Sequence, residues 1–228
     1  SGRKAVEVRV FSWAPSPRRC TDPVRRARPA HAAINPGAEE SDVLKKIHLH
    51  RGDLPEGLDL GPAVAVDSET MGLNPWRDRL CLVQLSKGDG VCHLVQFAKG
   101  PIVAPRLAAM LADRKTLKLF HFARFDVAMF QRNFGTPTQP IYCTKTASKL
   151  VRTMTDRHGL KDLCKELLGV DLSKQQQTSD WGADTLSEEQ KTYAASDVLH
   201  LHALKEKLDA LLAREGRQEL ARACFEFI

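Results

Sequence analysis

The stretch Ala63-Val64-Ala65-Val66-Asp67-Ser68-Glu69-Thr70 places two acidic residues at the end of a short apolar run. An uninterrupted apolar run of this length is typical of a strand that is buried on both faces of a sheet. Side chains two positions apart in a strand project from the same face, so Asp67 and Glu69 are predicted to lie side by side. Two carboxylates placed in this way repel each other unless a cation lies between them. Taken alone, such a pair is more often a solvated strand end, so its meaning depends on the rest of the chain.

Four other segments have the pattern of strands: 47–50, 80–85, 91–95 and 117–121. Residues 47–50 alternate apolar and polar side chains as an edge strand does. Asp89-Gly90, between the segments 80–85 and 91–95, is a signal for a hairpin turn. The sequence therefore predicts three consecutive antiparallel strands over 63–95.

Helical patterns follow Pro105 and occupy the chain from about Ala123 onward. Apolar residues recur at helical spacing over 160–168, and Gly169 ends that pattern. Ser187 and Gln190 form a capping box at the start of a long final helix. A strand meander followed by alternating helices and strands predicts the α/β class, with a mixed sheet flanked by helices.

The length of 228 residues fits one compact domain with an appendage. Residues 1–43 are rich in Arg, Pro and Ala and show little apolar periodicity, so they are predicted to be a disordered extension. A transit peptide and an over-extended gene start are the alternatives for this segment. The single folded domain is predicted to span 44–228.

Composition and charge exclude several classes of protein. The chain is 43% apolar and 27% charged, which suits a folded core and not a wholly disordered chain. Ten Lys or Arg and five Asp or Glu fall within residues 1–46, so most of the net charge of +6 belongs there and the rest is close to neutral. No apolar run approaches the ~18 residues of a membrane span. The six cysteines form no Cys-x-x-Cys pair, so we expect reduced thiols in a cytoplasmic protein and no zinc ribbon.

Two more acids stand at informative positions later in the chain. Asp126 follows the strand 117–121 where the chain passes into a helix, although an Asp at a helix start is also common for reasons of the helix dipole. In the final helix, the apolar stripe that contains Leu201 and Leu204 extends backward by fours to Asp197 and then to Tyr193. A carboxylate on a core-facing row needs a partner, a proton or a metal.

The four acids Asp67, Glu69, Asp126 and Asp197 therefore come from three separate segments. Oxygen ligands alone select hard cations, so the predicted cofactor is Mg²⁺ or Mn²⁺. Two such ions about 3.5–4 Å apart stabilise the attacking and leaving oxygens of a phosphoryl displacement. Tyr193 lies one helical turn before Asp197, and a phenol with a pKa of about 10 suits a group that positions the attacking water.

These residues resemble the motifs of the DEDD exonuclease superfamily, which has a ribonuclease H-like fold. Asp67-Ser68-Glu69-Thr70 resembles the first motif, the segment 121–126 the second, and Tyr193-Ala194-Ala195-Ser196-Asp197 the third. Thr192 stands where the histidine branch has its histidine, so Tyr193 is typical of the tyrosine branch, which includes ribonuclease D. The resemblance implies a single 3′-5′ exonuclease domain with two metal ions.

Over roughly 50–228 the chain is similar to the nano-RNase C family, short relatives of ribonuclease D that degrade diribonucleotides. The similarity rests on the segments 52–55, 70–73, 79–81, 119–126 and 174–181. It implies hydrolysis of short RNA, particularly 5′-phosphorylated dinucleotides, to nucleoside 5′-monophosphates. It also implies a closed homo-oligomer, a ring-like octamer.

Ten residues are predicted to contact the substrate, and each has a plainer interpretation. The residues 70–73 would line the terminal nucleotide. In the second motif, a phenylalanine would stack on a base and His121 would donate to a phosphate. The basic residues would hold a 5′ phosphate. The plainer interpretations are core packing for the apolar residues and for His121, and a solvated charge for the basic ones. The ten are Thr70, Met71, Leu73, His121, Phe122, Arg124, Phe125, Arg157, His158 and Lys161.

Two other functions stay open. One is a general ribonuclease D-like exonuclease on longer RNA or DNA, which would usually carry a basic track that the near-neutral domain does not predict. The other is a catalytically silent nucleic-acid-binding or assembly module. The presence of all five catalytic residue types argues against silence.

Overall fold

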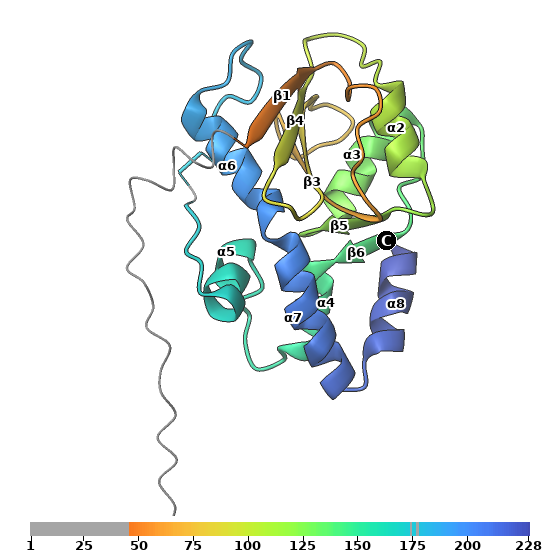
Figure 1. The fold of residues 1–228 in the computed structure, drawn as a ribbon, viewed down its shortest axis with the longest axis vertical. Helices are drawn as coiled ribbons and strands as arrows, with labels where there is room; N and C mark the ends of the chain where they lie inside the picture. The colour runs from red at the N-terminus through yellow and green to blue at the C-terminus, as the bar shows by residue number, and fades with distance from the viewer. Residues whose placement is uncertain (1–45, 174, 177) are drawn as a thin grey trace, which may run out of the picture. The chain divides into compact units, whose positions relative to one another are not determined.

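The structure is a computed structural model that describes residues 46–173, 175–176 and 178–228. The predicted extension over 1–43 lies outside the described residues. The described chain forms one six-stranded mixed sheet in the order β1-β4-β3-β2-β5-β6, with helices packed around it (Figure 1). The predicted fold class is confirmed.

The centre of the sheet is the predicted antiparallel meander. β2 (Ala63–Thr70), β3 (Leu80–Ser86) and β4 (Cys92–Gln96) pair as antiparallel neighbours. The Asp89 carboxylate accepts a hydrogen bond from the backbone N–H of Val91 in the turn between β3 and β4. β1 (Ile47–Arg51) is an edge strand, as its alternation predicts, and pairs with β4 in parallel.

The other half of the sheet is parallel. β5 (Leu117–Phe120) pairs with β2, and β6 (Ile141–Cys143) pairs with β5. The prediction that the chain is helical from about Ala123 onward did not include β6. Helix α3 (Arg124–Phe134) ends at Gly135, whose left-handed φ of 65° turns the chain back toward the sheet. A three-residue strand is too short to show a period of its own.

Lys118 on β5 is fully buried, which the sequence does not predict. Its Nζ donates to the carbonyl oxygens of Asp113, Thr116 and Gln139, each at 2.7 Å. All three ammonium hydrogens therefore have acceptors, which is the condition for burying a lysine.

Besides α3 and the short helix α5 (Leu160–Leu163), the described residues form these helices around the sheet: α2 (Pro105–Ala112), α4 (Thr144–Val151), α6 (Glu188–Leu199), α7 (Leu201–Arg214) and α8 (Gln218–Phe227). The predicted helix over 160–168 is present as α5 followed by the π-helical segment η1 (Cys164–Leu168), and it ends at Gly169. The capping box of Ser187 and Gln190 is confirmed at the start of α6.

The predicted long final helix is interrupted at His200. The two parts pack on different partners: α6 contacts β2, β3 and β4, whereas α7 contacts α4, η1 and α8 (Figure 1). A change of direction between them lets each part bury its own apolar side. No helix in the described part of the chain is long and apolar enough to cross a membrane.

Candidate active site

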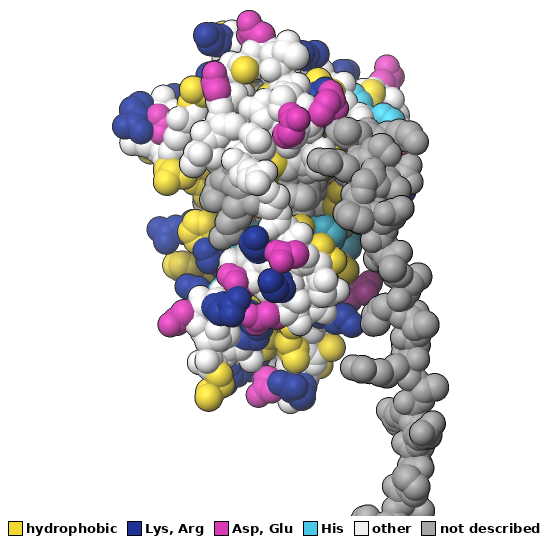
Figure 2. Space-filling view, turned by 90° about the vertical axis from the view of Figure 1, so that its left-hand side faces the viewer, with side chains coloured by type: hydrophobic (Ala, Val, Ile, Leu, Met, Phe, Trp, Pro, Cys, Tyr) yellow, Lys and Arg dark blue, Asp and Glu magenta, His cyan; other side chains and the backbone are white. Residues whose placement is uncertain are grey.

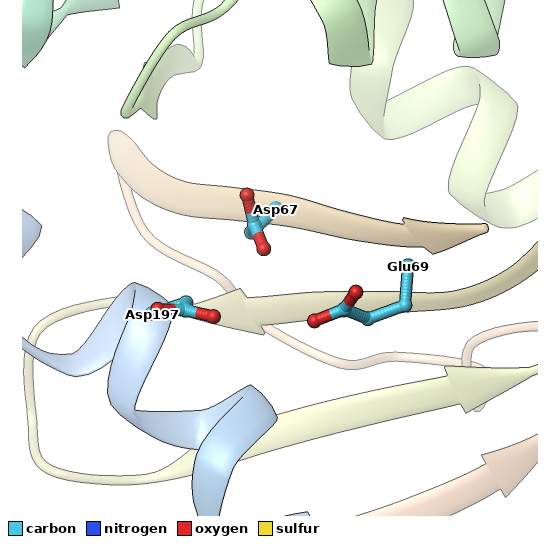
Figure 3. Close-up of side chains that lie close together, drawn as sticks. All are labelled: Asp67, Glu69 and Asp197. Atoms are coloured by element: carbon cyan, nitrogen blue, oxygen red, sulfur yellow. The ribbon is translucent and has the colours of Figure 1, made fainter. Parts of the chain in front are cut away.

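Three of the predicted acids meet at the C-terminal half of β2. Carboxylate oxygens of Asp67, Glu69 and Asp197 lie within 4.8 Å of one another. Figure 3 shows the three carboxyl groups turned toward a common point, with Asp197 contributed by α6. The two-residue spacing on β2 and the packing of α6 against β2 bring them together.

The fourth acid, Asp126, lies beside this cluster in the first turn of α3 and is 3% exposed. Ser68 donates its hydroxyl hydrogen to Asp126 Oδ1 at 2.6 Å. This contact joins the first motif to the second, and the sequence analysis did not assign Ser68 a role. The Asp126 charge also contributes to the raised pKa values of Asp67 and Glu69.

The carboxyl groups are difficult to ionise together. Burial, followed by the neighbouring carboxylates, raises the pKa of Glu69 to about 9 and that of Asp67 well above its ordinary value. Burial raises the pKa of Asp126 and of Asp197 to about 7. A divalent cation among these oxygens would remove the repulsion, and an all-oxygen donor set suits Mg²⁺ or Mn²⁺. The residues present therefore fit a hard metal ion.

Gln84 is a site residue that the sequence analysis missed. It is fully buried in the middle of β3, directly opposite Asp67 in the sheet register. Its Nε2 lies 3.5 Å from Asp67 Oδ2 and 3.5 Å from Glu69 Oε1. A lone polar residue inside the apolar segment 80–85 was the available signal. The amide faces the space between the two carboxylates of β2 and can orient both.

Tyr193 is on α6, one turn before Asp197, as predicted. Burial, and then the charges of Asp197, Glu69 and Asp67, raises the pKa of the phenol. The ring packs 6.0 Å from the buried ring of Trp181, centroid to centroid. Because the phenol keeps its proton at neutral pH, it acts as a hydrogen-bond donor and not as a base.

A cavity of about 330 Å³ opens at the acids. It has an acidic part, two lysines and several apolar side chains. Its lining consists of Asp67, Glu69, His121, Phe122, Lys145, Gly159, Leu160, Lys161, Leu172, Ser173, Tyr193 and Asp197. Lys145, in the first turn of α4, has no motif around it in the sequence and was not predicted.

Of the ten predicted substrate contacts, His121, Phe122 and Lys161 line this cavity. His121 Nδ1 lies 2.9 Å from the Thr144 hydroxyl, which itself donates to the carbonyl oxygen of Phe120. Burial, and then the Lys145 charge, lowers the pKa of His121 to about 3, so its ring is neutral. The interpretation of His121 as a core histidine is correct in that its ring is neutral and contacts the Thr144 hydroxyl. It is incomplete because His121 also lines the cavity.

The remaining predicted contacts lie elsewhere among the described residues. Phe125 packs against the core and Arg124 points into solvent. The Arg157 guanidinium donates a hydrogen bond to the Asp162 carboxylate. His158 is buried, with its Nδ1 2.8 Å from the Ser148 hydroxyl.

The residues after the first motif are on the surface. Thr70 donates to the carbonyl oxygen of Gly72 at 2.5 Å, and Met71 is half-exposed. Leu73 is 84% exposed, which rules out the plain core interpretation for this residue.

Comparison with known proteins adds a family and several relatives. The model of a 3′-5′ exonuclease family matches residues 46–213. Ribonuclease D of Gluconacetobacter diazotrophicus is 37% identical over 162 residues, which are 71% of this chain and 41% of that protein. The chain thus spans about two fifths of the length of the curated relatives it matches.

Solved structures show the same fold. NrnC of Brucella melitensis is 55% identical with a TM-score of 0.78, covering 80% of this chain and 89% of that one. NrnC has also been solved bound to pGG and with bound Mg²⁺. Ribonuclease D of Escherichia coli, an exoribonuclease involved in structured RNA processing, is 25% identical with a TM-score of 0.65, covering 83% of this chain and 46% of that one.

Proposed function

Because the chain belongs to the 3′-5′ exonuclease family, with ribonuclease D and NrnC among its relatives, we propose that it is a metal-dependent exoribonuclease that removes nucleoside 5′-monophosphates from RNA 3′ ends. The observation that carries the proposal is the convergence of Asp67, Glu69 and Asp197 within 4.8 Å at the wall of a cavity. Asp126 and Tyr193 complete the five catalytic residues.

Asp67, Glu69, Asp126 and Asp197 would hold the metal, which we propose to be two ions of Mg²⁺ or Mn²⁺. Bound there, the ions would make water a stronger nucleophile and stabilise charge on the phosphate oxygens. The Mg²⁺ in a structure of NrnC supports the choice of ion.

The chain's own residues have separate tasks in this mechanism. Tyr193 keeps its proton at neutral pH and would donate it in a hydrogen bond that orients the attacking water. Ser68 holds Asp126 by its hydroxyl, and Gln84 keeps the carboxylates of Asp67 and Glu69 in position.

The proposed substrate is short RNA, particularly 5′-phosphorylated dinucleotides. NrnC, 55% identical, has been solved bound to pGG. The cavity also combines the acids with Lys145 and Lys161, so one small ligand would meet both the metal site and two cations that suit a terminal phosphate. On the face shown in Figure 2, basic and acidic side chains of the described residues are interspersed and do not gather into a basic track, which suits a small ligand better than a long one.

A time course on labelled RNAs of two to seven nucleotides, with and without a 5′ phosphate, tests the proposal. We expect faster turnover of the 5′-phosphorylated dinucleotide than of the seven-mer at equal concentration, and binding at least about tenfold weaker without the phosphate. Lys161→Met should reduce the advantage of the 5′ phosphate, whereas Lys149→Met on the exposed side of α4 is the matched control.

Equal kcat/KM for the two lengths would contradict the dinucleotide preference and favour a general exonuclease on longer RNA or DNA. No hydrolysis of any length with Mg²⁺ or Mn²⁺ would favour the silent binding module. The homo-oligomer and the cytoplasmic location remain predictions, and sedimentation of the purified protein would test the former.

A further inference from the structure

Phe122 has a backbone conformation that its side chain does not favour. Its φ is +72°, and it is the one residue other than glycine with a positive φ in the described part of the chain. A bulky side chain in this region is strained, and strain of this kind persists only where the surrounding structure imposes it.

The surroundings of Phe122 do impose it. On one side, the Thr144 hydroxyl donates to the carbonyl oxygen of Phe120 and contacts His121 Nδ1 at 2.9 Å. On the other side, α3 begins, and the carbonyl oxygen of Phe122 accepts from the backbone N–H of Phe125 at 3.3 Å. The turn between β5 and α3 is therefore held at both ends.

Core packing does not explain the aromatic ring at this position. Phe120 on β5 and Phe130 on α3 are fully buried, with ring centroids 6.2 Å apart. Phe122 is instead 51% exposed and lines the cavity at the acids. A residue such as Asn accepts a positive φ with less strain, so the phenyl ring is the feature that needs a reason.

Lys145 supports the ring from α4. Its Nζ lies 4.3 Å from the ring centroid, which is within the range of a cation–π interaction, and Lys145 also lines the cavity. The ring is thus oriented before any ligand binds. An exposed, oriented aromatic ring beside a phosphodiester-binding site matches the platforms on which proteins stack nucleobases.

We propose that Phe122, supported by Lys145, is a stacking platform for one nucleobase of the substrate. The proposal rests on the proposed function for the nature of the ligand. Stacking is tolerant of base identity because every base has a π-face, so the platform contributes affinity without sequence preference. It makes Phe122 a determinant of KM, while the acids and Tyr193 determine kcat.

The test compares Phe122→Asn, which removes the ring and accepts the backbone conformation, with Phe122→Tyr, which keeps the ring. The probe is 2-aminopurine riboside 5′-monophosphate with Mg²⁺, whose fluorescence falls on stacking and which has no phosphodiester to hydrolyse. We expect Phe122→Asn to bind the probe at least about tenfold more weakly and Phe122→Tyr within about threefold of wild type. In the dinucleotide assay, Phe122→Asn should raise KM by a similar factor with kcat within about threefold.

The control is Phe227→Asn, which removes an aromatic ring that is 93% exposed on α8, outside the cavity. It should leave probe affinity and KM unchanged. The Tm of Phe122→Asn should not fall below that of wild type, because a strained backbone is relieved as ring contacts are lost.

Unchanged probe affinity and KM in Phe122→Asn would overturn the proposal. A fall in Tm of more than about 5 °C with KM unchanged would also overturn it, because the ring would then have a structural role only. If wild type hydrolyses dinucleotides but the probe shows no quenching, the platform is wrong and the proposed function stands. If the probe stacks on Phe122 but no RNA is hydrolysed, the proposed function is wrong and the platform stands.

Discussion

At Asp67, burial and neighbouring charge both oppose ionisation. The desolvation of the carboxyl group and the charges of Asp126, Asp197 and Glu69 all raise its pKa. Asp67→Asn removes one member of this repelling group, so we expect its Tm in EDTA to equal or exceed that of wild type. Turnover with Mg²⁺ should fall at least about 100-fold, because losing a group that only supports a metal ligand already costs about 10–100-fold.

Thermal unfolding with and without metal checks this prediction. Mn²⁺ should raise the Tm of wild type, because it binds only the folded form, and should raise that of Asp67→Asn much less. A variant that retains wild-type turnover, or gains as much stability from Mn²⁺ as wild type, would show that Asp67 is not a metal ligand.

Gln84 offers a test of how the metal site is oriented. Gln84→Met keeps the volume and removes the amide that faces Asp67 and Glu69. We expect the Mn²⁺ dissociation constant, measured by calorimetry, to rise about tenfold, within the range known for groups that support metal ligands. Gln96→Met is the control, because the buried Gln96 amide donates to the carbonyl oxygen of Ala183 and not to an acid. Equal metal affinity in wild type and Gln84→Met would reduce Gln84 to a packing residue.

Among the elements, the neighbouring strands β1 and β4 bring His48, His50 and His93 together. His50 Nε2 lies 3.0 Å from His93 Nδ1, and the ring of His48 stacks on that of His93. Burial, and then the charges of His50 and His48, lowers the pKa of His93 from 6.5 to about 4. Lys87 and Asp89 are the other charged groups that act on this ring.

These three histidines should make the protein less stable in acid. Between about pH 6.5 and about pH 4 the unfolded chain binds more protons at His93 than the folded protein does, so the free energy of unfolding falls as the pH falls. Because the ring is only half-buried, the effect should be on the order of 1 kcal/mol. Urea unfolding of wild type and His93→Gln at pH 7 and pH 5 should show a smaller loss in the variant. An identical loss in both proteins would place the acid sensitivity elsewhere.

For the whole molecule, net positive charge is more concentrated in the N-terminal segment than in the rest of the chain. Residues 1–43 contain eight Lys or Arg and five Asp or Glu, a net charge of +3, and the other 185 residues contain 26 Lys or Arg and 23 Asp or Glu, also +3. Deleting 1–43 should change kcat/KM on a dinucleotide by less than about threefold, since so small a ligand has few phosphates for this segment to contact. On longer RNA the deletion should matter more at low salt than at high salt, because screening weakens such attraction. A fall of more than tenfold on the dinucleotide would place the segment at the site.

Local patterns in the chain were enough to predict the antiparallel meander over 63–95, the capping box at Ser187 and the end of the helix at Gly169. They also predicted that Asp67 and Glu69 share one face and that Tyr193 and Asp197 share another. These features depend on backbone periods of two and 3.6 residues and on turn and cap chemistry, which act between near neighbours in the chain. The short strand β6 and the break at His200 escaped prediction because they depend on the elements that pack beside them.

The completed site depends on contacts between distant segments. Ser68 meets Asp126 across 58 residues, and Gln84 faces Asp67 because the β2–β3 register sets them opposite each other. Lys145 reaches the cavity because α4 follows β6 beside the turn that holds Phe122. In the chain these are an ordinary serine, glutamine and lysine. Burial and position are acquired only when the sheet and helices assemble, so their roles follow from the tertiary structure and not from any local pattern.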